Sequence, residues 1–189
     1  MSSAIQETRS IVNGIDTNAL KQLAGQAAEG GRAAQVKFAV ATQWRGGVAS
    51  RTLVDGYSVG GKTVTKDFKI DIDEPCELLG ANAGPNPQEM LMAAFNACMI
   101  VGYAAGASMN GIKLESLSIE SSGQLDLRGF MGLDANVKPG YERIHYVVRI
   151  KGNGTREQFE EIHQNVIKTS PNRWTIANPV KLSSDLIVE

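Results

Sequence analysis

The sequence predicts an α+β fold, in which antiparallel strands pack around helices. Stretches that alternate apolar and polar residues, typical of half-buried strands, lie within residues 35–72 and 114–151. Between them, residues 86–109 carry helix-start signals followed by a long uncharged run. The expected order of elements is therefore βββ-α-ββ-α-β.

The first three strands are expected to form an antiparallel meander. Residues 35–44 alternate in polarity, and two further strands, 51–59 and 64–72, are separated by a Gly-Gly pair that is typical of a hairpin turn. Before them, residues 1–33 are expected to be an N-terminal leader or arm with a short helix. Residues 34–189 then form the main domain.

A long central helix is predicted up to Met109. Asn86 can cap its first amides, Pro87 suits the first helical position, and Glu89 can reach back to the cap. A helical wheel surrounds Cys98, in the middle of this helix, with apolar residues. A membrane span and a helix buried on every side both fit the uncharged run, and its many Ala and Gly residues favour burial.

The second half of the chain is expected to add two strands, a helix and a final strand. The two strands lie at residues 114–127 and 141–151, and the second alternates cleanly in polarity. Thr155 and Gln158 match a capping box for a second helix, which a Ser-Pro pair ends. Residues 179–188 are expected to form the last strand.

Composition excludes several classes of function. The 19 Lys and Arg residues nearly balance the 20 Asp and Glu residues, without a basic cluster, so neither nucleic acid nor a membrane is an expected partner. Two cysteines make no disulfide scaffold, and no signal peptide is apparent, which indicates the reducing cytoplasm. Two histidines, with no pair at ligand spacing, favour neither a metal nor another cofactor.

Cys98 needs a partner group if it is to react. A thiol on a buried apolar wall is normally kept protonated by desolvation, and a guanidinium is the cation that keeps its charge when buried. Arg45 and Arg51 flank a Gly-Gly turn, and either could be brought to the helix by its own sheet or by a second subunit. The alternatives are an inert core cysteine and arginines at the surface.

The run NPQEMLMAAFNAC resembles the N-P-E-x-L-x-A-A-x-x-A-C run of the OsmC/Ohr family, named for osmotically inducible protein C and organic hydroperoxide resistance. A Trp-x-Gly-Gly turn, an ELLG stretch before the helix and a small residue before Pro after the second helix agree with it. The resemblance runs from about Val36 to the C-terminus. It implies an intertwined homodimer with two sites at the subunit interface.

The resemblance also implies reduction of small organic hydroperoxides. In the family a peroxidatic cysteine becomes a sulfenic acid, a second cysteine condenses with it, and a dithiol reductant restores the thiols. Cys98 matches the peroxidatic position. Ser170 stands where the second cysteine is expected, so the two-cysteine cycle cannot run as in the family. Cys76 could resolve the sulfenic acid instead.

Other positions depart from the family pattern as well. Gln88 replaces the Glu that follows Pro, and Glu89 lies one place further on. Val48 falls where an Arg follows the Gly-Gly pair, which leaves Arg51 or Arg45 as substitutes. Two functions therefore stay open: residual or one-cysteine peroxidase chemistry at Cys98, and a non-catalytic module that binds a small hydrophobic or acyl ligand in the interface pocket.

Overall fold

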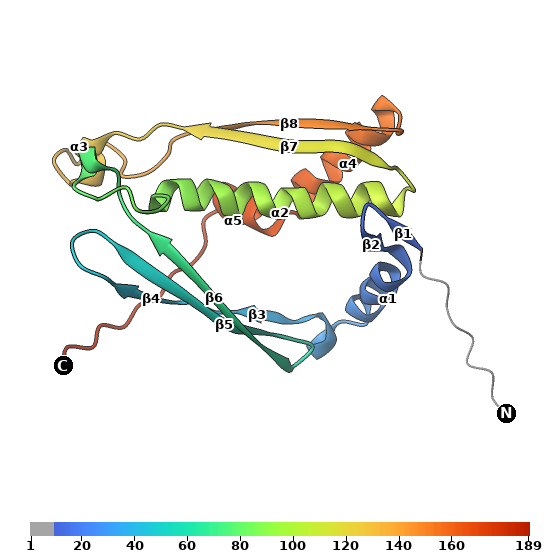
Figure 1. The fold of residues 1–189 in the computed structure, drawn as a ribbon, viewed down its shortest axis with the longest axis horizontal. Helices are drawn as coiled ribbons and strands as arrows, with labels where there is room; N and C mark the ends of the chain where they lie inside the picture. The colour runs from blue at the N-terminus through green and yellow to red at the C-terminus, as the bar shows by residue number, and fades with distance from the viewer. Residues whose placement is uncertain (1–9) are drawn as a thin grey trace. The chain divides into compact units, whose positions relative to one another are not determined.

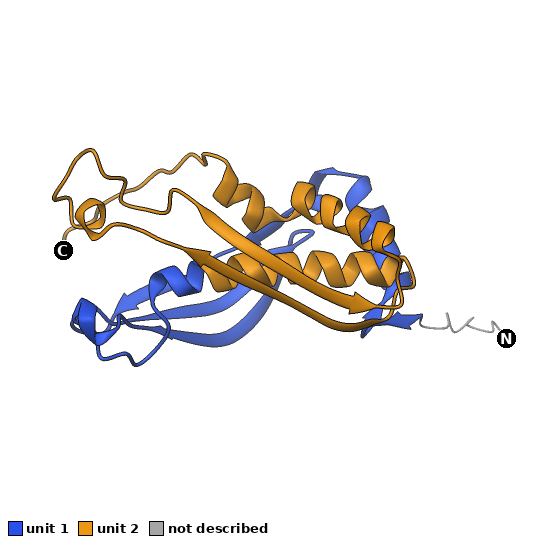
Figure 2. Ribbon diagram, turned by 90° about the horizontal axis from the view of Figure 1, so that it is seen from above, with its two compact units in different colours: residues 1–91 blue, residues 92–189 orange. Residues whose placement is uncertain are grey.

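The computed structural model describes residues 10–189, which divide into two compact units (Figure 1, Figure 2). Unit 1 is Met1–Leu91 and unit 2 is Met92–Glu189. Both units combine antiparallel strands with helices, which confirms the α+β prediction. Residues 1–9 of the expected leader lie outside the described residues, and the boundary between leader and domain at residue 33 stays a prediction.

Unit 1 begins with a small hairpin that the sequence did not suggest. Strands β1 (Ile11–Val12) and β2 (Ile15–Asp16) pair in antiparallel fashion and lead into helix α1 (Thr17–Ala28). The Asp16 carboxylate accepts hydrogen bonds from the N–H groups of Asn18 and Ala19, as expected of a cap. Because α1 buries only Thr17, it is an exposed helix. The short 3₁₀ helix η1 (Gly31–Ala34) follows it.

The predicted meander forms a four-stranded sheet. Strand β5 (Ser50–Val59) pairs with β3 (Val36–Phe38) and β4 (Ala41–Trp44) on one side and with β6 (Lys62–Ile72) on the other. The single strand expected over residues 35–44 is thus divided, because β3 and β4 pair with different parts of β5. Between those parts the register of β5 and β6 shifts at a bulge.

Glycine makes two features of this sheet possible. A Cβ on Gly56, at the bulge, would lie 2.5 Å from the carbonyl oxygen of Val64, so only glycine lets the two strands stay this close. Gly60 and Gly61, between β5 and β6, have φ angles of 56° and 77°, the left-handed conformation that a tight hairpin requires. The predicted hairpin turn is therefore confirmed.

One face of the unit 1 sheet carries large apolar side chains that are exposed to solvent. The register places Val54 opposite Phe68, and Ser50 between Trp44 and Ile72, so these side chains share a face. Trp44 is 76% exposed and Phe68 is 61% exposed. Among residues 10–91, no large apolar side chain is fully buried.

The loop before the central helix is organised by a buried carboxylate. Asp73 accepts hydrogen bonds from the N–H groups of Ala83, Ala81 and Glu74 at 2.9 to 3.1 Å. These bonds, led by the one from Ala83, hold the pKa of Asp73 below its ordinary value. The loop includes the short 3₁₀ helix η2 (Cys76–Leu78), on which Cys76 is exposed.

Unit 2 is built around helix α2 (Pro87–Met109), most of which belongs to it. Strands β7 (Leu114–Gly123) and β8 (Ile144–Gly152) form an antiparallel hairpin, joined by a long connection that includes α3 (Leu127–Phe130). Helices α4 (Arg156–Thr169) and α5 (Pro171–Ala177) follow, and Figure 1 shows α2 and α4 lying along the hairpin. The capping box of Thr155 and Gln158 is present as predicted.

The core of unit 2 joins these helices to one face of the hairpin. Its fully buried apolar side chains are Phe95, Met99, Tyr103, Ala107, Ile112, Ile162 and Val166. Strand residues on one face of the hairpin, which include Leu117, Ile119, Tyr146, Val148 and Ile150, pack against them. Asn96 adds a polar contact, since its amide donates to the Ile119 carbonyl at 3.3 Å and its oxygen accepts from the Ser121 hydroxyl.

Helix α2 was predicted to be buried on every side. In the single chain it is buried along one stripe. Its buried side chains recur every four residues, whereas Val101 is 68% exposed. Among residues 10–189, α2 is the one helix long and apolar enough to span a membrane by length and composition, a test that core helices also pass. Its buried stripe and its many small residues favour the core helix.

The prediction of a last strand is wrong. The end of β7 and the start of β8 also differ from the expected bounds. Residues 178–189 form no helix or strand, because no strand among the described residues pairs with them. The Ser-Pro pair that ends α4 also begins α5, with Pro171 in its first position. β7 ends at Gly123, earlier than expected, where a Cβ would meet the ring of Tyr141 at 2.8 Å.

Substitution of Met99 tests which residues form the core of unit 2. Because its side chain is fully buried on α2, we expect Met99→Ala to lower the free energy of unfolding by about 2–5 kcal/mol. The same substitution at Met131, which is 55% exposed, should change it by less than about 0.5 kcal/mol. Urea unfolding followed by circular dichroism measures both, and equal losses would contradict this core.

Candidate functional site

Cys98 lies half-buried on α2, beside Ser170. The Ser170 hydroxyl donates a hydrogen bond to the Cys98 sulfur at an Oγ–Sγ distance of 3.5 Å. Ser170 itself is buried. The family resemblance matched these two positions to a pair of cysteines. In the structure the two side chains are in contact.

Ser170 is held in place by the junction of two helices. Its N–H donates to the Val166 carbonyl at the end of α4, and its own carbonyl accepts from the Trp174 N–H in α5. The Asn172 amide donates to the Ala94 carbonyl at 2.8 Å, which ties the start of α5 to α2 one turn before Cys98. These contacts align the hydroxyl with the sulfur.

Arg173 is a cation at this end of unit 2 that the sequence did not single out. Its Nη1 donates to the Ile167 carbonyl at 2.9 Å, a favourable place for a cation at the end of α4. Its Nε donates to the Tyr146 hydroxyl at 3.2 Å, and the Tyr146 ring packs edge-on against Phe95. The signal that could have identified it is a lone arginine three residues after the serine of the Ser-Pro pair.

The two predicted arginines belong to unit 1. Arg51 makes a two-point ion pair with Asp71, with Nε–Oδ1 and Nη2–Oδ2 distances of 2.6 and 3.0 Å. The hydrogen bond from Arg51 lowers the pKa of the Asp71 carboxyl. Arg45 is exposed and lines a cleft of about 270 Å³ together with Arg51, Asp71 and Asp73. Their approach to Cys98 stays a prediction.

Gln88 and Glu89 lie in the first turn of α2, at the end of unit 1. The Glu89 carboxylate accepts from the Asn86 N–H at 2.8 Å, and the Asn86 side chain accepts from the Glu89 N–H at 2.8 Å. Glu89 is therefore engaged in a cap, as one of its predicted roles required. Gln88 is half-buried on the same turn. A role for either residue in catalysis stays a prediction.

Comparison with known proteins identifies the fold. A solved structure of an OsmC-like protein from Mycoplasma pneumoniae is similar, with a TM-score of 0.59 and 15% identity over 75% of this chain and 87% of that one. An OsmC-like protein from Vibrio cholerae is also similar, with a TM-score of 0.56 and 16% identity over 74% and 92%. No curated protein matches the sequence.

The family model described as OsmC-like protein matches residues 80–185, more than half of the 189-residue chain. The chain belongs to the OsmC-like family. The matched range contains Cys98 and Ser170, so both residues lie within the part of this OsmC-like protein that the family model matches.

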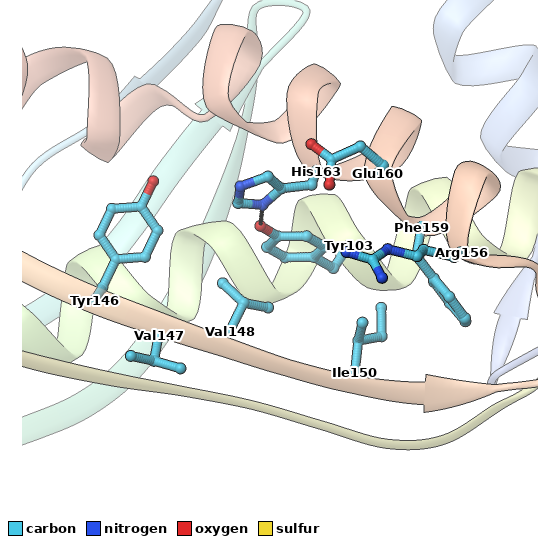
Figure 3. A pocket seen from close by; sticks show the side chains of 9 residues that line it. All are labelled: Tyr103, Tyr146, Val147, Val148, Ile150, Arg156, Phe159, Glu160 and His163. Carbon is cyan, nitrogen blue, oxygen red and sulfur yellow. Dashed lines mark hydrogen bonds between the residues drawn. The ribbon is translucent and has the colours of Figure 1, made fainter.

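A second group of polar side chains lines a cavity of about 560 Å³ in unit 2 (Figure 3). The Tyr103 hydroxyl and His163 Nδ1 form a hydrogen bond that joins α2 to α4. Burial raises the pKa of Tyr103 to about 12, so the phenol keeps its proton at neutral pH. The sequence analysis did not identify this pair, whose two residues are 60 positions apart in the chain.

The contact between Cys98 and Ser170 can be tested by cross-linking. Because the two side chains already meet, we expect Ser170→Cys to form a disulfide with Cys98 under mild oxidation. Peptide mass spectrometry should find the linked pair. Thr169→Cys, at an exposed neighbouring position, is the matched control and should leave Cys98 free. Preferential linkage of the control would contradict the geometry.

Proposed function

We propose that this OsmC-like protein is a one-cysteine thiol peroxidase that reduces small organic hydroperoxides at Cys98. The observation that supports this most directly is the hydrogen bond from the buried Ser170 hydroxyl to a half-buried sulfur. A sulfur that is neither sealed nor freely exposed can meet a small substrate while being protected from larger reactants.

The proposed first step is nucleophilic attack by the Cys98 thiolate on the terminal oxygen of the hydroperoxide. An S–O bond forms and the O–O bond breaks, which leaves Cys98 as a sulfenic acid and releases an alkoxide that takes up a proton to become the alcohol. The sulfur is oxidised by two electrons and the peroxide is reduced by two. The Ser170 hydroxyl is placed to donate to the sulfur during this step.

The return to the thiol requires an external dithiol reductant, because Ser170 occupies the position of the family's second cysteine. One reductant thiol condenses with the sulfenic acid, forming a mixed disulfide and water. The second reductant thiol then attacks its own sulfur in that mixed disulfide, which releases the Cys98 thiolate and an oxidised reductant. A dithiol thus performs both exchanges without a second protein cysteine. Free thiols suit the reducing cytoplasm expected from the sequence.

We further propose that the active form is a homodimer. Large apolar side chains on the unit 1 sheet, including Trp44 and Phe68, are open to solvent in the single chain, as is Val101 on α2. Exposed apolar surface of this kind is typical of protein interfaces. A second subunit would cover it, and would be the means of bringing Arg45 or Arg51 to Cys98.

The peroxidase proposal predicts a sulfenic acid at Cys98. After reduced protein is mixed with cumene hydroperoxide and a sulfenic-acid trap, mass spectrometry should find the label on Cys98. Cys98→Ser should abolish labelling, and Cys76→Ser should retain it, because Cys76 lies in an exposed loop. Unlabelled Cys98 in the Cys76→Ser variant would refute the proposal and favour the non-catalytic module for a hydrophobic or acyl ligand.

The dimer proposal predicts that a charge on the apolar sheet face separates the subunits. We expect Phe68→Lys to shift the protein from dimer to monomer in sedimentation velocity at micromolar concentration, because burying an unpaired charge in an interface is costly. Lys69→Ala is the control, since the next residue of a strand points to the opposite face. A monomeric wild-type protein would contradict the proposal.

A further inference from the structure

The cavity beside α4 has the properties of a separate ligand site in unit 2. It lies between β8 and α4, and its lining residues are Tyr103, Tyr146, Val147, Val148, Ile150, Arg156, Phe159, Glu160 and His163 (Figure 3). Neither Cys98 nor Ser170 lines it. Its volume of about 560 Å³ falls in the usual range of small-molecule pockets, roughly 300–1,000 Å³.

One wall of this cavity is apolar. Val148 and Ile150 project from β8 and the Phe159 ring projects from α4, so strand and helix together offer hydrocarbon surface to a ligand (Figure 3). Both strand residues also pack against the core of unit 2 through the same face of the hairpin. The wall is therefore rigid, and it suits an aliphatic chain or an aromatic ring.

The polar groups at the cavity are mainly hydrogen-bond donors. The Tyr103 hydroxyl and His163 Nδ1 already share a hydrogen bond with each other, and the direction of that bond depends on the tautomer of His163. The Tyr146 hydroxyl accepts from Arg173 Nε, which leaves its proton for another acceptor. A ligand rich in acceptor oxygens matches this arrangement.

Charge at the cavity comes from one cation and one anion on α4. Arg156 points into the cavity in Figure 3, and among residues 10–189 its guanidinium has no ion pair or hydrogen bond. Glu160, one turn later, accepts a hydrogen bond from the Gln164 amide at 2.9 Å. A single available guanidinium suits a monoanion, and the nearby carboxylate disfavours a dianion such as a phosphate monoester.

We infer that this cavity binds an amphipathic monocarboxylate, with the carboxylate on Arg156 and the hydrocarbon part along Val148, Ile150 and Phe159. The guanidinium presents two parallel N–H groups to the two carboxylate oxygens. The Tyr146 hydroxyl donates to a further oxygen on the ligand. The site is independent of the chemistry proposed at Cys98.

Calorimetric titration of the full chain with octanoate tests this inference. We expect saturable binding of octanoate, and binding of 1-octanol, which has the same tail and no carboxylate, weaker by about tenfold or more. Arg156→Gln should weaken octanoate binding by about tenfold or more and leave 1-octanol unaffected. Lys168→Gln, a cation on α4 outside this cavity, is the matched control and should bind octanoate as the wild type does.

Several results would overturn the inference. One is the absence of any heat of binding for octanoate up to about 5 mM. A second is equal binding of octanoate and 1-octanol. A third is an equal loss of octanoate binding in the Arg156 and Lys168 variants. A change of sedimentation in Arg156→Gln with octanoate binding intact would also overturn it, since the cavity would then be a protein contact. Sulfenic-acid labelling of Cys98 in the same variants should be unchanged, which separates this test from that of the peroxidase.

Discussion

The close approach of α4 to α2 is the constraint on which the rest of unit 2 depends. A Cβ on Gly102 would lie 3.0 Å from Val166 Cγ2, and one on Gly106 would lie 3.0 Å from Ile162 Cγ2. These distances are tighter than ordinary contacts, so the two glycines set how near α4 can come. Because Ser170 directly follows the last residue of α4, this spacing also determines where the hydroxyl meets the sulfur.

The same approach places two chemically different sites on one pair of helices. At the end of α4, Ser170 and Arg173 lie over the part of α2 that carries Cys98 and Phe95. Nearer its start, His163 reaches Tyr103 and lines the open cavity beside β8. Neither Cys98 nor Ser170 lines that cavity, so the two sites have different residues at their surfaces.

Local signals in the sequence predicted what depends on neighbouring residues. The caps at Asn86 and Thr155 are present, because each needs only a side chain and an amide within one helical turn. The division of β3 from β4 was not predictable in this way, since it arises from pairing with two parts of β5. The strand expected over residues 179–188 has no partner strand among the described residues.

The candidate site shows the same limit. The run around Cys98 and the small residue before Pro171 were enough to identify Cys98 and Ser170 as a pair, because family resemblance carries three-dimensional information. Arg173 and the bond between Tyr103 and His163 lie outside that resemblance. Each contact joins elements far apart in the chain, and the sequence alone does not show which of these elements meet.

Asn96 gives the central helix its rotational setting. The buried stripe of α2 is mainly apolar, and Asn96 adds a polar side chain with two fixed partners beside it. A one-residue slip turns every side chain by about 100° about the helix axis. The amide of Asn96, anchored to the Ile119 carbonyl and the Ser121 hydroxyl, would lose both partners on such a slip. Asn96 therefore fixes the rotation of α2 about its axis. That rotation in turn determines the direction in which the sulfur of Cys98, two residues later, points.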